Sequence, residues 1–339
     1  MSQRPDIKKI DPIYAIPGGE IAIECAGFNA ADNSGGCYFG GQKAGITAAS
    51  RKRLLVKVPD ESSGSISVRL ESGGMSSDEA EINIGRMIAD EMHFVGNPAV
   101  DPNDGTIIMT RSGGRGQELP ATLFKLEDDG YWNEMTANVM NPTGLAFDKK
   151  GDLYVSNRAA GEVYRIHNGE AEFFASGLGI ATGIAFDKDG TLFVGDRSGT
   201  IFRVGEFGIA EPFADVEPSV AAYHIAFGPD GRLYVSSPGL ASSDVIYAVD
   251  DGGAVERYAK GFGRPQGLAF DNAGNLYAAA CFRGRHGVVR IDAETREAET
   301  VVAGNSIVGL CFNRTGDMIV ASGDKLYSVP VGVFGTLLK

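Results

Sequence analysis

Cysteine, histidine and tryptophan are scarce in this chain of 339 residues, which has four, four and one of them. The cysteines, Cys25, Cys37, Cys281 and Cys311, are too few and too scattered for a disulfide framework or a zinc ribbon. Pairing of Cys25 with Cys37 stays open, but a small buried thiol within a strand is the commoner state, and we favour it. The cysteines thus exclude a zinc ribbon, and we expect no metal site and no cofactor unless the alternative that needs a divalent metal such as Ca²⁺ or Mg²⁺ holds.

Positive charge is also limited, because 31 Lys and Arg stand against 44 Asp and Glu, for a formal net charge of −13. A protein of this charge repels polyanions on average. Nucleic acid and anionic membrane surfaces are therefore excluded as default partners.

Long apolar runs are absent. No segment approaches the roughly 18 apolar residues of a membrane span, and the first residues lack the apolar core of a secretory signal. We therefore expect a soluble protein that, as written, stays in the cytoplasm.

Segments with helical apolar periodicity are missing too, and the frequency of glycine, with 47 residues, is about twice the average of roughly 7%. Turns and strands should dominate.

One phrase recurs through the C-terminal three quarters of the chain. In the segment from Pro142 to Ser156 it begins with Gly and a hydrophobic residue and continues with Phe-Asp, a short turn that contains Gly, and Leu-Tyr-Val. Aligned on Leu145, Ile184, Ile225, Leu268 and Leu310, the copies are 39, 41, 43 and 42 residues apart. A degenerate sixth copy covers residues 97–109. Periods of this length are typical of propellers and solenoids.

Each copy predicts a four-stranded antiparallel meander, whose apolar faces and unpaired edges are best covered by packing the copies around an axis. We therefore predict a six-bladed β-propeller over residues 86–339. A strand at residues 90–95 should complete the last blade beside residues 325–329 and so close the ring.

Residues 1–85 lack the repeat and contain short strands separated by Gly, Ser, Asp and Pro, which predicts a small Ig-like β-sandwich. The order of Pro12, Pro17-Gly-Gly, Gly27-Phe28, Tyr38-Phe-Gly-Gly and Val58-Pro59 resembles the TIG/IPT family. The resemblance implies an accessory module that contacts a protein partner, and no catalysis. Because such modules often stand beside larger domains at bacterial surfaces, it also points to the cell envelope, which a shortened start would reconcile with the missing signal. The fold class is thus all-β, an Ig-like sandwich followed by a propeller.

A ligand site is expected where the start of each first strand meets the end of each second strand, since both lie at one rim. Arginines there offer planar donor forks for a sugar, a carboxylate or an acidic peptide. The alternative is that these polar residues only bind water and cap strand ends. The expected ligand-binding residues are Asn141, Thr143, Asn157, Arg158, Thr182, Asp196, Arg197, Tyr223, Gln266 and Arg283, and the ring is completed by Asn97, Arg111, His224, Ser237, Cys281 and Val308.

The repeat phrase resembles the NHL-repeat proteins and the senescence-marker-protein/gluconolactonase group. The second resemblance implies a divalent metal, Ca²⁺ or Mg²⁺, held at this rim by Glu, Asn and Asp and used to hydrolyse a lactone. Here the matching positions are Thr143, Thr182 and Gln266, with Asn97 and no Glu in the first copy, so the anionic ligands are missing. Asp187-Lys-Asp-Gly190 imitates a calcium loop but is interpreted as a hairpin turn.

The sequence thus favours a non-catalytic propeller that binds a small molecule, a sugar or an acidic peptide at its rim, with the Ig-like module available to a protein partner. The alternative is a metal-dependent hydrolase or lactonase with a remodelled site. A third reading is a lyase with His224, the one histidine expected near the rim, as general base.

Overall fold

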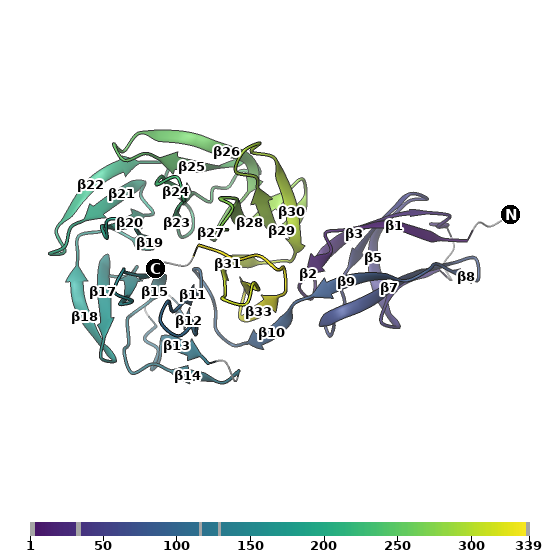
Figure 1. Ribbon diagram of the computed structural model, residues 1–339, viewed down its shortest axis with the longest axis horizontal. Coiled ribbons are helices and arrows are strands. Elements are labelled where there is room, and N and C mark those ends of the chain that lie inside the picture. Colours follow the sequence, from purple (N-terminus) through teal and green to yellow (C-terminus); the bar gives the residue numbers. More distant parts are fainter. Residues whose placement is uncertain (1–3, 32–34, 115–116, 128–129, 337–339) are drawn as a thin grey trace.

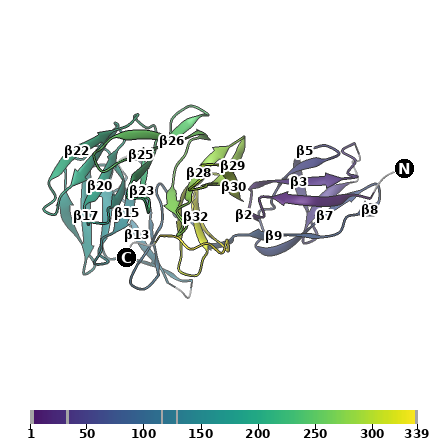
Figure 2. The same ribbon diagram turned by 45° about the horizontal axis from the view of Figure 1, so that its top comes forward.

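The computed structural model describes residues 4–31, 35–114, 117–127 and 130–336. These residues form strands, turns and loops, and no helix is found among them. In the described ranges there is accordingly no helix of the length and hydrophobicity needed to cross a membrane. Figure 1 shows a ring of β-sheets with a smaller β-rich part beside it, and Figure 2 shows that this part extends outward from one side of the ring.

The N-terminal part is a sandwich of two sheets. One contains β1, β3, β6 and β5 in that order, and the other joins β4, β7, β9 and β2, with β5 also reaching β4. Alternating apolar residues such as Ile21, Ile23, Leu54 and Val56 fill the space between the sheets. The strands are β1 (Asp6–Asp11), β2 (Tyr14–Ala15), β3 (Glu20–Ala26), β4 (Gly36–Phe39), β5 (Gln42–Ala49), β6 (Arg53–Lys57), β7 (Gly64–Ser72), β8 (Met75–Ser76) and β9 (Ala80–Ile84).

Cys25 and Cys37 are both free and buried in this sandwich. Burial raises the pKa of the Cys25 thiol to about 11 and that of the Cys37 thiol to about 12. The two residues therefore pack as small apolar side chains, as the sequence favoured.

The ring has the propeller-like arrangement that the repeats predicted (Figure 1). Its strands are β10 (Arg86–Ala89), β11 (Ala99–Val100), β12 (Ile107–Thr110), β13 (Leu123–Leu126), β14 (Trp132–Glu134), β15 (Pro142–Phe147), β16 (Leu153–Asn157), β17 (Glu162–His167), β18 (Glu170–Ala175), β19 (Ala181–Phe186), β20 (Leu192–Asp196), β21 (Thr200–Val204) and β22 (Ala210–Asp215). They continue with β23 (His224–Phe227), β24 (Leu233–Ser236), β25 (Asp244–Val249), β26 (Val255–Gly263), β27 (Leu268–Phe270), β28 (Leu276–Phe282), β29 (Arg285–Ile291), β30 (Ala298–Ala303), β31 (Ile307–Phe312), β32 (Met318–Ser322) and β33 (Lys325–Val329).

The number of separate blade sheets differs from the expected six. Among the described residues, four sheets of the ring stand alone with four strands each, whereas β23–β26 and β27–β30 belong to a larger sheet of 17 strands. The reason is that β26 runs on and pairs with β28 through Phe262 and Gly263, and that β30 pairs with β2 of the sandwich. Extra edge pairing therefore merges sheets that the repeat alone would keep apart.

An early strand closes the ring, but it lies four residues before the predicted segment. β10 pairs antiparallel with β33, and Met87 lies opposite Tyr327. Residues 90–95, which were expected to form this strand, instead lead from β10 towards the next sheet, and the amides of Met92 and Phe94 donate to the carbonyls of Asp324 and Gly323. An early strand does pair with residues 325–329, but it is formed by Arg86–Ala89 and not by residues 90–95.

The aromatic positions of the repeat hold neighbouring copies together. The second-strand aromatic of one copy packs edge-to-face on the first-strand Phe of the next, with ring centroids 4.9 Å apart for Tyr154 and Phe186 and 4.9 Å for Tyr234 and Phe270. The Asp of the repeat caps the turn between the two strands, because Asp187 Oδ1 accepts from the amides of Asp189 and Thr191. The segment from Asp187 to Gly190, which resembles the start of a calcium-binding loop, is therefore a hairpin turn, as predicted.

The sandwich contacts the ring directly. β2 pairs in parallel with both β9 and β30, and the amide of Ile16 donates to the carbonyl of Ala303 at 2.8 Å. Arg285 of the ring forms an ion pair with Asp11 at 2.9 Å. Backbone pairing and an ion pair thus fix the two parts against each other.

Candidate functional site

The rim predicted from the sequence exists as a geometric feature. Pro142 at the start of β15 lies opposite Asn157 at the end of β16, and Ala181 of β19 lies opposite Asp196 of β20. The first-strand starts and the second-strand ends therefore do lie at one end of the ring.

Several of the predicted ligand residues are buried there and occupied with holding the fold. Thr182 Oγ1 donates to the carbonyl of Gly195 and accepts from the amide of Tyr223, both at 3.0 Å. Tyr223 is fully buried, its hydroxyl donates to the carbonyl of Glu217, and burial raises its pKa to about 12. Thr143 is buried as well. These side chains set the spacing between neighbouring repeats.

Asn157 and Asp196 cap the loops that follow their strands. Asn157 Oδ1 accepts from the amides of Ala159 and Ala160, and Asp196 Oδ1 accepts from the amides of Ile180 and Ser198. Their equivalent positions in two repeats thus correspond to a shared structural turn, which the sequence had left open as an alternative.

Arg158 and Arg197 follow these two caps and are only half-buried. Arg158 Nη2 donates to the carbonyl of Gly113 at 3.5 Å, and Arg197 Nη2 donates to the carbonyl of Val220 at 2.9 Å. Burial and then the positive charge of Arg197 lower the pKa of Arg158. Neither guanidinium has a carboxylate partner within the described ranges, so two neighbouring positive charges are left uncompensated.

A small pocket of about 300 Å³ lies at the same end of the ring. Its lining includes Gly113, Thr122, Met140 and Asn141. Asn141 is 7% exposed, and its Oδ1 atom has no hydrogen-bond partner in the described part of the chain. Because the carbonyl of Asn141 accepts from the amide of Arg158, the pocket and the arginine pair are adjacent.

Other predicted residues are spread around the rim. Gln266 and Arg111 are half-buried, while Arg283 is exposed and stacks over the ring of Phe282, with 4.9 Å from the guanidinium carbon to the ring centroid. Asn97 lies deeper, because its amide group spans the carbonyl of Leu268 and the amide of Leu310. It joins the first copy to the last two across the axis.

His224 occupies a position that holds glycine in the other repeats. The corresponding residues in the neighbouring copies include Gly144, Gly183, Gly267 and Gly309, and a Cβ atom on any of them would meet the backbone of the next copy at less than 3 Å. The aligned repeats contain this signal, although the sequence reasoning did not use it. His224 is 3% exposed, its Nε2 atom has no partner among the described residues, and burial lowers its pKa to about 4.

Two of the residues that match the metal-binding positions of the gluconolactonase group hold the fold together. Thr143 and Thr182 are buried and directed to backbone groups, and no carboxylate stands in their register. No cluster of three or more His, Cys, Asp or Glu that can hold a metal ion occurs in the part of the chain that the structure describes.

Comparison with known proteins follows the two parts of the chain. Residues 5–82 match the family described as IPT/TIG domain. No curated protein sequence matches this chain. Among solved structures, the whole chain is similar to an auxiliary nutrient binding protein from Bacteroides thetaiotaomicron, with 12% identity, a TM-score of 0.56, and 96% of this chain and 97% of that chain covered.

A gluconolactonase from Xanthomonas campestris is also similar, with 17% identity, a TM-score of 0.60, and 72% of this chain and 88% of that chain covered. A protein from Bacteroides thetaiotaomicron described as of unknown function has 13% identity and a TM-score of 0.57 over 96% of this chain and 98% of that chain. At these identities the likeness concerns the fold alone. The chain therefore has an IPT/TIG domain at residues 5–82, followed by a propeller-like ring of the kind found in gluconolactonases and nutrient-binding proteins.

Proposed function

We propose that this protein is a non-catalytic binding protein whose ring holds a small carboxylate-bearing molecule, such as an acidic sugar, between Arg158, Arg197 and the pocket at Asn141. The observation that carries the proposal is the pair of half-buried guanidinium groups, which contact backbone carbonyls and have no carboxylate partner in the described residues. Two like charges taken partly out of water are unfavourable unless an anion compensates them.

Arginine suits this role because its planar fork donates two parallel hydrogen bonds to a carboxylate. The free Oδ1 atom of Asn141 then offers an acceptor for a hydroxyl group of the same ligand. The similarity to nutrient-binding structures, which share both parts of this architecture, supports a binding role. The IPT/TIG domain remains the proposed contact for a protein partner.

We also propose that the ring consists of six repeats related to those of NHL proteins. The strands β23–β26 and β27–β30 follow the same consecutive antiparallel order as the separate four-stranded sheets. In this interpretation the larger sheet contains two further blades whose edges have joined.

The test is calorimetric titration with galacturonate and with galactose, which lacks the carboxylate, together with the other common uronate and neutral sugar pairs. We expect a uronate to bind, its neutral partner to bind at least tenfold more weakly, and binding to weaken as salt is raised. Arg158→Gln and Arg197→Gln should each lower the affinity by about tenfold or more, since a charged hydrogen bond contributes about 1.5 to 3 kcal/mol. The control Arg296→Gln removes a positive charge from a distant turn and should change nothing.

Equal binding of the neutral sugars, or full affinity in both arginine variants, would contradict the proposal. The hydrolase alternative is tested on the same samples by adding Ca²⁺ or Mg²⁺ after chelation and measuring lactone hydrolysis. Micromolar metal binding with metal-dependent turnover that is lost in His224→Gln would replace the binding role with an enzymatic one.

A further inference from the structure

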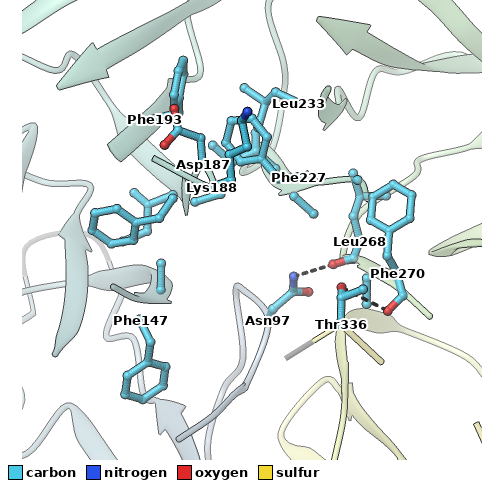
Figure 3. A pocket seen from close by; sticks show the side chains of 18 of the residues that line it. Asn97, Phe147, Asp187, Lys188, Phe193, Phe227, Leu233, Leu268, Phe270 and Thr336 are labelled. Carbon is cyan, nitrogen blue, oxygen red and sulfur yellow. Dashed lines mark hydrogen bonds between the residues drawn. The ribbon is translucent and has the colours of Figure 1, made fainter. Parts of the chain in front are cut away.

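The larger cavity of the ring lies at the end opposite the arginine rim. It has a volume of about 700 Å³ and is lined by the later residues of the first strands and by the turns that follow them. This volume is within the range of roughly 300 to 1,000 Å³ that is common for small-molecule pockets. Figure 3 shows residues from several repeats around it, among them Phe227 and Leu268.

The inner wall of the cavity is largely apolar, because five of the repeats contribute the same aliphatic position to it. These residues are Leu145, Ile184, Ile225, Leu268 and Leu310. Sequence reasoning used them only to align the repeats. Because these side chains converge around the axis, they form a hydrophobic lining.

An aromatic group extends the cavity between two neighbouring repeats. Phe193 packs edge-to-face against Phe213 and Phe227, with ring centroids 5.0 and 5.2 Å apart. Phe147, Phe186, Phe270 and Phe312, the equivalents of Phe227, are buried, whereas Phe227 is half-buried. Here a turn with Gly228 and Pro229 replaces the usual Asp turn, and the cavity opens beside it.

The mouth of the cavity carries more negative than positive charge. Its lining has five carboxylates, Asp148, Asp187, Asp189, Asp250 and Asp251, and three cationic residues, Lys149, Lys188 and Arg203. Arg203 also forms an ion pair with Glu211 at 3.4 Å. In the turns, Asp187 and Asp250 accept amide hydrogens through Oδ1, so that Oδ2 remains available to a ligand.

We propose that this cavity is a second binding site, for a small apolar or aromatic molecule that carries a positively charged amine. The aliphatic wall takes the apolar body, and the carboxylates together with the half-buried ring of Phe227 favour the cation. The guanidinium of Arg203 already lies over the ring of Phe213, 5.9 Å from its centroid, so Phe213 contributes apolar contact only. This site is independent of the arginine rim, because it lies at the other end of the ring and selects the opposite charge.

The test compares two probes of similar shape, 1-naphthylmethylammonium and 1-naphthylacetate, by calorimetric titration of the full chain at pH 7.5. We expect the amine to bind at least tenfold more tightly than the acid. The double variant Asp187→Asn/Asp250→Asn should weaken amine binding by fivefold or more. Folding of this variant is expected, because Asn313 caps the turn equivalent to that of Asp187 by accepting from the amides of Thr315 and Asp317. Asp250 accepts from the same i+2 and i+4 positions in its own turn, so Asn fits there as well.

Two further variants locate the site. Phe227→Leu keeps an apolar side chain but removes the ring face, and should weaken amine binding several-fold. Asp292→Asn removes a carboxylate from a turn outside the cavity and should leave it unchanged. Equal affinity for the two probes would refute the charge selection, and absence of amine binding to the unmodified protein, or full affinity in Phe227→Leu and the double variant, would refute the site itself.

Discussion

At the scale of single residues, the most informative departure from the repeat is His224. Glycine elsewhere lets the backbones of adjacent copies touch near the axis, as at Gly183, where a Cβ atom would lie 2.6 Å from the carbonyl of Tyr223. At His224 an imidazole stands in that position, buried and with Nε2 unpartnered among the described residues. The role of His224 as a general base remains a prediction, and its environment favours the neutral form.

The pH dependence of stability tests this environment. Since the folded pKa of His224 is lowered from 6.5 to about 4, the unfolded chain binds an extra proton between these pH values, and stability falls as the pH falls through this window. The loss is on the order of 3 kcal/mol, following about 1.4 kcal/mol per pH unit. His224→Gln should lack this loss. Urea unfolding of both proteins from pH 7.5 to 4 should therefore show that the difference between their free energies of unfolding shrinks. A constant difference would contradict the buried, neutral imidazole.

At the scale of elements, the strand pair β10 and β33 decides whether the ring stays closed. The inner face of β10 contributes Ala89, which is 5% exposed and packs with Met92, Phe94 and Leu326. Met87 on the same strand is 48% exposed. The ring is therefore held at this seam by backbone pairing and by one buried face of a four-residue strand.

Ala89→Asp should open this seam. It places a carboxylate in an apolar cluster without a partner, which costs about 3 kcal/mol or more. Met87→Asp changes the same strand on its exposed face and should alter stability by less than about 0.5 kcal/mol. Thermal unfolding and amide hydrogen exchange of β33 measure both effects. Similar behaviour of the two variants would show that the seam does not depend on this packing.

At the scale of the whole molecule, the sandwich and the ring form one extended unit through β2 and β30 (Figure 2). Gly19 allows the approach, because a Cβ atom there would lie 2.5 Å from the carbonyl oxygen of Ala303. The side chain of Asn305 also donates to the carbonyl of Gly18 at 2.7 Å. Contacts between backbones thus set the orientation of the two parts.

Gly19→Ala should loosen this contact. We expect a destabilisation of about 1 to 3 kcal/mol, the usual effect of an overpacked atom, and a larger radius of gyration in solution scattering as the two parts separate. Gly45→Ala is the matched control, because a Cβ atom at Gly45 has no neighbour within 4 Å. An unchanged radius in Gly19→Ala would contradict the role of Gly19 in the close approach of the two parts.

The sequence by itself determined the all-β class, the IPT/TIG match of residues 5–82, the propeller-like ring and the turn role of Asp187, because repeat spacing, turn residues and alternation are local properties of the chain. The tertiary structure decided how many sheets stand alone, which strand closes the ring and where the cavities lie. The sheets of two repeats merge through Phe262 because the edges of β26 and β28 meet in space. Leu145 and Ile184 line a cavity only because repeats that are distant in the sequence converge on one axis. Burial likewise separated Thr182 and Tyr223, which hold the fold, from Arg158 and Arg197, whose charges remain uncompensated.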